Sequence, residues 1–407
     1  AELYQPTGVT VDTIGNVYIA DGSNNRIRKI GINGKISTVA GNGAGGFSGD
    51  GGQATAAELN DPAAIAVDKK GNIYIADYYN DCIRQVNSSG VINTIAGNGS
   101  FGFSGDGGQA TNAELNSPTG VAVDNSGNVY IVDANDRIRK VNTAGIINTI
   151  AGNGNTGFSG DGGQATAAEF NFPQGLSVDT AGNIYIADAG NNRVRKINAL
   201  GVIATIAGNG TAGALGNKGQ ATAAELNAPT GVQTDKMGNV YIADWKNNCI
   251  RKISDSGIIT TVAGNDSIGF YGDGGPSTVA ELNAPYAIAL DTTGNLYIAD
   301  VNNNRIREVT TPWLEKVQEL IINNEELGIY PNPNKGIFTL GVKSEELRTK
   351  GTVEAYNMLG EKVYSNSFST FHSQFSINLS AQPNGIYLVK VQTEDGNILT
   401  QKIEITK

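Results

Sequence analysis

The sequence predicts an all-β protein that consists of a six-bladed β-propeller followed by a small Ig-like β-sandwich. The first observation is a 55- or 56-residue repeat, which marks a propeller, a solenoid or another repeat array. The second is that each repeat holds four short strand patterns and no apolar helical period. The third is a change of pattern after Val309. The repeat is marked by Tyr-Ile-Ala-Asp or a near copy, which ends at Asp21, Asp77, Asp133, Asp188, Asp244 and Asp300.

The first repeat shows how each blade is encoded. Alternating, β-branched residues predict strands at Gly8–Asp12 and Val17–Asp21, joined by a Gly-Asn turn. A polar turn leads to a third strand at Arg26–Ile30. An Asn-Gly pair is a strong hairpin signal, and it precedes a fourth strand at Ile36–Ala40.

A long glycine-rich loop, Gly41–Asn60 in the first repeat, follows each fourth strand. It contains the run Gly-Phe-Ser-Gly-Asp-Gly-Gly, which degenerates after the fourth repeat to Gly213–Gly219. The run lacks the alternating Asp-x-Asp-x-Asp series of a calcium loop, so we expect no metal site there. The aspartates of the loops are Asp50, Asp106, Asp161 and Asp273.

The combined pattern Pro-x-Gly-x-x-x-Asp, Gly-Asn-x-Tyr-Ile-Ala-Asp and Asn-Asn-Arg-Ile-Arg-Lys resembles the NHL repeat over roughly residues 1–310. The added glycine-rich loop is similar to the long NHL variant of bacterial surface proteins and of the teneurin propeller. The resemblance implies a six-bladed propeller of a family used mostly for binding, with a minority of lyases.

Two sets of six carboxylates and one set of six arginines recur in register. The first set of carboxylates ends the first strands, and the second is the Tyr-Ile-Ala-Asp set. We expect both to cap turns rather than bind a cation, because a ligand site normally breaks the symmetry of a repeat. We expect the arginines to pair with these aspartates. The first-strand aspartates are Asp12, Asp68, Asp124, Asp179, Asp235 and Asp291, and the arginines are Arg28, Arg84, Arg139, Arg195, Arg251 and Arg307.

Charge and histidine content limit the function. The net charge is −10, and residues 1–311 carry 28 acidic and 20 basic side chains, so nucleic acid is not an expected partner. The only histidine is His372, beyond the propeller. Chemistry based on a histidine base or ligand is therefore excluded from the propeller, and we predict a non-enzymatic protein without cofactors. A lyase or hydrolase with carboxylate-only metal chemistry is the alternative.

The candidates for ligand contact are aromatic side chains that break the repeat consensus, because rings on a rigid rim stack on sugars or anchor a protein partner. The alternative is that they are isolated surface rings. They are Tyr78, Tyr79, Phe101, Trp245, Tyr271 and Tyr286.

The two cysteines, Cys82 and Cys249, occupy one repeat position three blades apart, where other blades carry arginine. Opposite blades lie too far apart for a disulfide, which needs Cα atoms within roughly 7 Å. We therefore expect two free thiols.

The carboxy-terminal region predicts a linker at 312–328 and a domain at 329–407. Residues 312–328 fit either a short helix or a strand at Val317–Ile322 that completes the sixth blade. A dense turn signal at Ile329–Gly336 then precedes a series of strands. The expected strands are Ile337–Val342, Gly351–Asn357, Lys362–Ser367, Phe375–Leu379, Gly385–Thr393 and Ile398–Ile405.

This last domain resembles the type A sorting domain of the Bacteroidota type IX secretion system. The resemblance implies export across the outer membrane by that machinery, removal of the domain by a surface protease, and anchoring or release of the propeller. Protein binding, adhesion or assembly is then the expected role. The motif residues include Tyr330, Pro331, Asn332, Pro333, Gly336, Gly385, Tyr387, Lys402 and Lys407.

Two further expectations concern the ends and surface of the propeller. Residue 1 falls inside a repeat, so we expect that an upstream segment precedes the chain, and the sixth repeat lacks a recognisable fourth strand. We expect its edge to be completed by Val317–Ile322, an upstream segment or a neighbouring molecule. Acceptor-like Asp-Ser/Thr sequences also predict O-glycans, at Thr13, Thr180, Ser267 and Thr292.

Overall fold

The computed structural model describes residues 2–310, 327–330, 335–342, 351–357, 362–368, 375–393 and 398–406. The chain forms two compact units, Ala1–Val309 and Thr310–Lys407, which are treated separately below. No helix among these described residues is long and apolar enough to cross a membrane.

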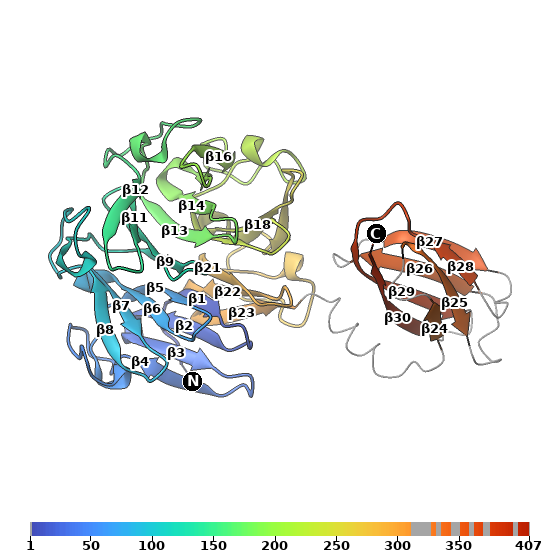
Figure 1. The fold of residues 1–407 in the computed structure, drawn as a ribbon, viewed down its shortest axis with the longest axis horizontal. Helices are drawn as coiled ribbons and strands as arrows, with labels where there is room; N and C mark the ends of the chain where they lie inside the picture. The colour runs from blue at the N-terminus through green and yellow to red at the C-terminus, as the bar shows by residue number, and fades with distance from the viewer. Residues whose placement is uncertain are drawn as a thin grey trace. The chain divides into compact units, whose positions relative to one another are not determined.

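The first unit is a ring of six antiparallel sheets, the blades (Figure 1). Each blade is a meander with its strands in chain order, and the sixth has three strands within the described residues. Blades one to three contain β1 Pro6–Val11, β2 Val17–Asp21, β3 Arg26–Ile30, β4 Ile36–Ala40, β5 Pro62–Val67, β6 Ile73–Asp77, β7 Cys82–Val86, β8 Ile92–Ala96, β9 Gly120–Val123, β10 Val129–Asp133, β11 Arg137–Val141 and β12 Ile147–Ala151. Blades four to six contain β13 Pro173–Val178, β14 Ile184–Asp188, β15 Arg193–Ile197, β16 Ile203–Ala207, β17 Pro229–Thr234, β18 Val240–Asp244, β19 Cys249–Ile253, β20 Ile259–Ala263, β21 Pro285–Leu290, β22 Leu296–Asp300 and β23 Arg305–Val309.

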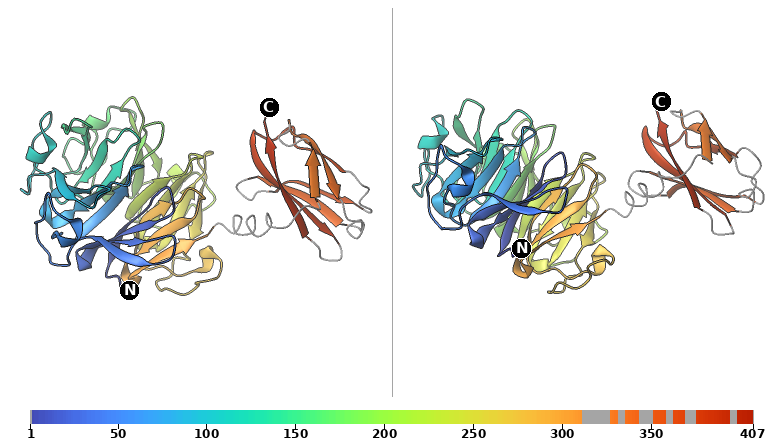
Figure 2. Two further views of the ribbon diagram at one scale, coloured as in Figure 1. Left: turned by 60° about the horizontal axis from the view of Figure 1, so that its bottom comes forward. Right: turned by 90° about the horizontal axis from the view of Figure 1, so that it is seen from below.

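The two faces of the ring differ because neighbouring strands run antiparallel. One face, the loop face, carries the starts of the first strands, the long loops and the connections between second and third strands. The other, the turn face, carries the hairpin turns (Figure 2). The loop face also holds the short 3-10 turns between second and third strands: η1 Gly22–Asn24, η3 Tyr78–Asn80, η6 Ala189–Asn191, η8 Trp245–Asn247 and η10 Val301–Asn303. A second set of 3-10 turns lies within the long loops, and its first member bonds the hairpin turn of blade two through the Ala54 N–H and the Gly90 carbonyl. This set consists of η2 Ala54–Ala56, η4 Ala110–Asn112, η5 Ala165–Ala167, η7 Ala221–Ala223 and η9 Ser277–Val279.

The apolar core lies in layers between successive blades. Tyr18 and Ala20 of blade one pack with Ile73 and Ile75 of blade two, and all four are buried. Burying a side chain such as Ile75 contributes roughly 1.5–3 kcal/mol. A single blade has no such partner, so the ring is stable only when its repeats stack.

The ring closes between blade six and blade one. The backbone N–H of Gln5 donates to Asn304 Oδ1 at 2.8 Å, as that of Asp61 donates to Asn25 Oδ1 between blades one and two. A core cluster that includes Val9 of blade one and Ala299 of blade six spans the same seam. The prediction of six blades in one closed ring is confirmed.

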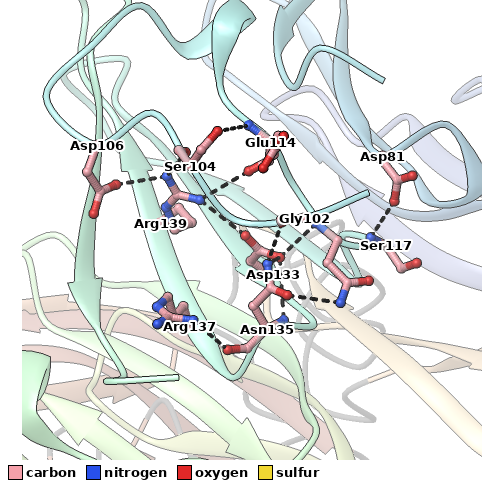
Figure 3. A network of polar contacts seen from close by, with 11 residues as sticks. Asp81, Gly102, Ser104, Asp106, Glu114, Ser117, Asp133, Asn135, Arg137 and Arg139 are labelled. Carbon is pink, nitrogen blue, oxygen red and sulfur yellow. Dashed lines mark hydrogen bonds and ion pairs between the residues drawn. The ribbon is translucent and has the colours of Figure 1, made fainter. Parts of the chain in front are cut away.

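The repeated arginine holds its blade to the loop that enters it (Figure 3). In blade three, Arg139 Nη1 lies 3.2 Å from Asp133 Oδ2. Its Nη2 donates to Asp106 Oδ1 at 2.8 Å and to the Ser104 carbonyl at 3.0 Å. Asp133 Oδ1 accepts the Asn116 N–H at 2.9 Å. The predicted pairing with the Tyr-Ile-Ala-Asp carboxylate is confirmed, and the second partner, on the loop, was not expected.

The two carboxylate sets therefore have different roles. Asp12 caps its own turn by accepting the N–H groups of Ile14 and Asn16, as predicted. The expectation that the Tyr-Ile-Ala-Asp carboxylates cap their own turns through backbone N–H groups holds only for Asp133, which accepts the Asn135 N–H at 3.5 Å, whereas Asp77 accepts the Asn80 side chain of its turn. Asp77, for example, accepts the Asn60 N–H at 2.7 Å and so anchors the preceding loop.

The second unit contains two sheets around one core. The sheets have the strand orders β24-β25-β28 and β27-β26-β29-β30, and their buried residues form a single cluster that includes Phe338, Val353 and Val389. An Ig-like topology remains a prediction. The strands are β24 Leu327–Tyr330, β25 Ile337–Val342, β26 Gly351–Asn357, β27 Lys362–Phe368, β28 Phe375–Asn378, β29 Gly385–Thr393 and β30 Ile398–Ile405.

One sequence-based assignment in this unit was wrong. Tyr330 belongs to β24, where it pairs with Thr339, rather than to a turn, and the strand begins at Leu327 inside the predicted linker. The strand has only four residues and is followed at once by a run rich in proline and asparagine, so the turn signal masked it. The segment Val317–Ile322 and the motif residues Pro331, Asn332, Pro333 and Lys407 lie outside the described residues.

Candidate functional site

A central channel passes between the first strands of the six blades, β1, β5, β9, β13, β17 and β21, as predicted. Its cavity has a volume of about 250 Å³. The strands approach closely because glycine occupies key positions: a Cβ on Gly175 would lie 2.4 Å from the Thr230 carbonyl oxygen. Tyr286 is the only ionisable side chain among the described residues that line the channel.

The loop-face end of the channel, which we call the channel mouth, is formed by the residue that follows the first-strand proline in each blade. Tyr286 of blade six donates its hydroxyl to Gln174 Oε1 of blade four, reaching past blade five. Thr230 of blade five donates its hydroxyl to the Tyr286 carbonyl at 2.8 Å. The mouth is thus asymmetric, although the ring is nearly regular. Its six residues are Thr7, Ala63, Thr119, Gln174, Thr230 and Tyr286.

Aromatic side chains of the 3-10 turns make edge-to-face ring contacts near this mouth. The rings of Trp245 and Tyr286 meet edge to face, with centroids 6.5 Å apart. The rings of Tyr78 and Tyr79 do the same at 4.8 Å. Burial, with smaller contributions from nearby Tyr78 and Asp61, raises the pKa of Tyr286. Three of the six aromatic candidates, Tyr286, Trp245 and Tyr78, therefore lie near the mouth, and Tyr79 contacts Tyr78.

The other two aromatic candidates lie elsewhere on the loop face. Phe101 and Tyr271 project from the long loops, are 71% and 76% exposed, and do not line the channel. Three of the six aromatic candidates, Tyr78, Trp245 and Tyr286, are half-buried rather than fully exposed. Sequence reasoning missed Gln174, whose only signal was a polar residue at a position that carries threonine in three other blades.

The buried acids of the blades are structural. Burial raises the pKa of Asp77 to about 6, against the opposing effects of hydrogen bonds from Asn60 and Asn80 and of Arg84. Around Asp12, burial is outweighed by hydrogen bonds from Asn16 and its neighbours, which together lower its pKa. Among the residues that the structure describes, no three His, Cys, Asp or Glu side chains are grouped so as to hold a metal ion.

Both cysteines are free, as predicted, and both are buried. Cys82 pairs with Asp77 in the strand register in which Arg26 pairs with Asp21. Burial raises the pKa of both thiols, so neither is a reactive nucleophile in the folded protein.

The predicted glycan acceptors are all exposed. Thr13, Thr180 and Thr292 lie in hairpin turns of the turn face, and Ser267 lies in a long loop of the loop face. Their modification stays a prediction.

The described sorting-motif residues stabilise the second unit. Gly336 has φ +95°, and a Cβ there would lie 2.5 Å from Ser380 Cα, so only glycine fits. Tyr387 is buried in β29, and its hydroxyl donates to the Pro383 carbonyl at 2.8 Å. Gly385 begins β29, where it pairs with Ile405, and Lys402 lies in β30 opposite Leu388.

Comparison with known proteins finds a matching family for each of the two units. Residues 43–102, 102–158, 154–215 and 210–270 match the Teneurin NHL domain, and residues 3–30 match the NHL repeat. The chain therefore belongs to the NHL-repeat β-propeller family. Residues 328–406 match the Secretion system C-terminal sorting domain, so the protein is a secreted or outer-membrane-surface propeller exported by the type IX system of Bacteroidota.

Curated relatives share part of their length with this chain. Teneurin-4 of Mus musculus is 32% identical over 266 residues, which are 58% of this chain and 10% of teneurin-4. Protein SUPPRESSOR OF QUENCHING 1 of Arabidopsis thaliana is 30% identical over 269 residues, 62% of this chain and 25% of that protein. The match thus spans a quarter or less of these relatives.

Solved structures show the same fold at low identity. A Bacteroides thetaiotaomicron protein of unknown function has a TM-score of 0.56 at 23% identity and covers 76% of this chain and 70% of its own. An auxiliary nutrient binding protein from the same species has a TM-score of 0.54 at 15% identity, with coverage of 76% and 69%. Virginiamycin B lyase of Staphylococcus aureus reaches 0.47 at 17% identity, with coverage of 77% and 85%, too distant to carry an argument about function.

Proposed function

We propose that this secreted propeller is a non-enzymatic binding protein that takes a neutral, hydroxyl-rich ligand, a glycan, at the channel mouth. The asymmetry of the mouth carries the proposal. Tyr286 and Gln174 break a nearly exact repeat at the same end of the channel, and Trp245 packs against Tyr286. Aromatic rings beside amide and hydroxyl groups form the usual surface for stacking on sugars and bonding their hydroxyls.

The electrostatics of the channel favour a neutral ligand over a charged one. Its described lining consists of threonine, serine, glutamine, glycine and aliphatic residues, with Tyr286 as the single ionisable group. Inside the channel an ionic ligand would have no countercharge, and burying an unpaired charge is costly. The same composition supports a binding role over catalysis, because no pair of groups there can act as acid and base.

The proposal is tested by tryptophan fluorescence. The chain contains only two tryptophans, so Trp313→Phe leaves Trp245 as the sole reporter. Titration of this variant with neutral oligosaccharides is expected to shift or quench its emission. In the chain that retains Trp313, Trp245→Ala is expected to weaken binding, measured by calorimetry, by about tenfold, which corresponds to about 1.4 kcal/mol.

Phe101→Ala is the matched control, since it removes an exposed ring of a long loop that does not line the channel. It is expected to leave affinity unchanged. Equal losses in the two variants, or saturable binding of charged but not neutral oligosaccharides, would contradict the proposed site. Binding of a polypeptide with the same dependence on Trp245 would replace the glycan by a protein partner.

A further inference from the structure

Asp61, which directly precedes the first strand of blade two, places a carboxylate at the channel mouth. Its Oδ1 and the hydroxyl oxygen of the mouth residue Thr7 lie 2.8 and 3.3 Å from the point that a Cβ on Gly22 would occupy. The charge of Asp61 also contributes to the raised pKa of Tyr286, whose hydroxyl bonds Gln174 across the mouth. Asp61 therefore lies beside the proposed glycan site.

The carboxylate of Asp61 is half-buried and accepts no hydrogen bond from the residues that the structure describes. Burial alone acts on its pKa and raises it. Acids at the next two seams between blades differ, because Asp81 accepts the Ser117 N–H at 2.7 Å and Asp136 accepts the Phe172 N–H at 3.0 Å. A carboxylate that is partly removed from water without a donor is unfavourable in the free protein. The mouth thus holds an acceptor that a bound ligand can satisfy.

Local structure fixes the position of this carboxylate. Asp61 has φ +53°, a conformation that aspartate and asparagine adopt more readily than most residues. Its N–H donates to Asn25 Oδ1 of blade one at 2.8 Å. Gly22 stands at the turn position where blades two and five carry Tyr78 and Trp245, and the absence of a side chain there leaves room for the carboxylate.

The repeat position of Asp61 varies among the blades, and Asp61 is the only acid there. Asp61 therefore breaks the symmetry of the ring at the same end of the channel as Tyr286 and Gln174 do. The residues at this position in the other blades are Gln5, Ser117, Phe172, Ala228 and Ala284.

We propose, in an inference that rests on the proposed function, that Asp61 selects the glycan by accepting hydrogen bonds from two adjacent hydroxyl groups of one sugar. The two oxygens of a carboxylate accept from a pair of neighbouring donors at once, and such charge-assisted bonds are stronger than those between neutral groups. The sugar ring stacks on the aromatic side chains of the mouth in the same pose. Binding thereby gives the carboxylate of Asp61 the donors that the described residues do not supply.

Calorimetric titration of the full chain with maltotriose, cellotriose and mannotriose tests this role. Asp61→Asn keeps the shape of the side chain and suits the left-handed backbone. It is expected to weaken binding of the trisaccharide that binds most tightly by roughly ten- to hundredfold, the effect of losing hydrogen bonds to a charged group. Its Tm is expected to be unchanged or higher, because the variant removes a half-buried charge that has no described partner.

Further measurements separate the position of the carboxylate from its charge. Asp255→Asn is the matched control, since it removes an exposed acid from a hairpin turn of the turn face, and it is expected to leave affinity unchanged. Gly22→Ala keeps the charge of Asp61 but places a Cβ 2.8 Å from its Oδ1, so it is expected to weaken binding. Analogues of the bound sugar that lack one of the two hydroxyls are expected to bind the native chain more weakly. They are expected to bind Asp61→Asn about as well as the parent sugar does.

Three results would overturn the role of Asp61 while the glycan site stands. The first is that the trisaccharide binds Asp61→Asn as tightly as the native chain. The second is that Asp61→Asn lowers Tm together with affinity, which would show a structural role. The third is that glucosamine oligomers bind more tightly than neutral ones and lose this advantage in Asp61→Asn, which would make the carboxylate the partner of an amine. If no neutral oligosaccharide binds the native chain, the proposed function fails and this inference fails with it.

Discussion

Arg84 Nη2 and Asp50 Oδ1 lie 2.7 Å apart and join the third strand of blade two to the loop that enters that blade. The arginine is fully buried, and the aspartate is 42% exposed. The same pairing recurs at Arg139 and Arg195. It converts a glycine-rich loop, which is otherwise costly to order, into a fixed part of the loop face.

Blade five lacks this pairing, and restoring it is expected to stabilise the propeller. Asn217 stands where the other loops carry aspartate, and Nη2 of Arg251 is buried without a partner. Asn217→Asp is expected to raise the free energy of unfolding by about 1–2 kcal/mol. The reverse change, Asp161→Asn, is expected to lower it by about 1–3 kcal/mol because it partly strands Arg195. Denaturant unfolding measures the free energy of unfolding of both variants. If the two substitutions change it equally and in the same direction, the pairing is not what stabilises the loops.

The two thiols are expected to be inert in the folded protein. Cys82 and Cys249 are buried, and burial raises their pKa. Ellman's reagent should modify neither thiol under native conditions and both after unfolding in guanidinium. Rapid labelling of one cysteine in the native state would show that its blade opens locally.

Gly8 and Gly175 occupy the same repeat position, but replacing them with alanine is expected to lower stability by different amounts, because the space for a Cβ differs. A Cβ on Gly175 would lie 2.4 Å from the Thr230 carbonyl oxygen, but one on Gly8 would keep at least 3.1 Å from its neighbours. Gly175→Ala should cost about 1–3 kcal/mol through overpacking, and Gly8→Ala clearly less. Thermal unfolding of the two variants measures the difference. A larger loss of stability for Gly8→Ala than for Gly175→Ala would mean that the first strands are packed less closely at blade four than at blade one.

Stability is expected to depend on pH through two groups of aspartates with opposite signs. The pKa values of Asp77, Asp188 and Asp244 rise to about 6, so the folded state binds more protons than the unfolded state between about pH 4 and 6. Their contribution is complete below the unfolded pKa and is lost as the pH rises through about 6. Tm should therefore increase as the pH falls from 7 towards 4.5.

Below this pH range the second group of aspartates, whose pKa values are lowered, determines how stability depends on pH. The lowered pKa values of Asp12, Asp124 and Asp179 mean that their contribution is present above the unfolded pKa of 3.8 and is lost as the pH falls through their folded values. Calorimetry across pH 3–7 should show a maximum in Tm. A Tm that falls steadily from pH 7 to 4.5 would show that the buried acids stay ionised.

The predicted glycan sites can be checked on protein secreted by its own host. Thr13, Thr180 and Thr292 sit in exposed hairpin turns, where a sugar displaces no packing. Peptide mass spectrometry is expected to find hexose-containing forms of these peptides and of the Ser267 peptide. Four unmodified peptides would show that the sequence matches are coincidental.

The sequence by itself determined the architecture. The 56-residue period, the alternation within Val17–Asp21 and the Asn-Gly turn predicted the blade strands to within about two residues at each end, because these signals are local and repeat six times. The capping role of Asp12 was likewise predictable, since its partners lie within four residues of it. Short-range hydrogen bonding leaves its pattern in adjacent residues.

Tertiary structure alone decided which of the unusual residues act together. Tyr286 and Gln174 are 112 positions apart, and only closure of the ring brings their side chains into contact at the channel mouth. The pairing of Arg84 with Asp50 also depends on segments that meet only after folding. Such contacts are set by the curvature of the ring and the stacking of sheets, which no run of neighbouring residues encodes.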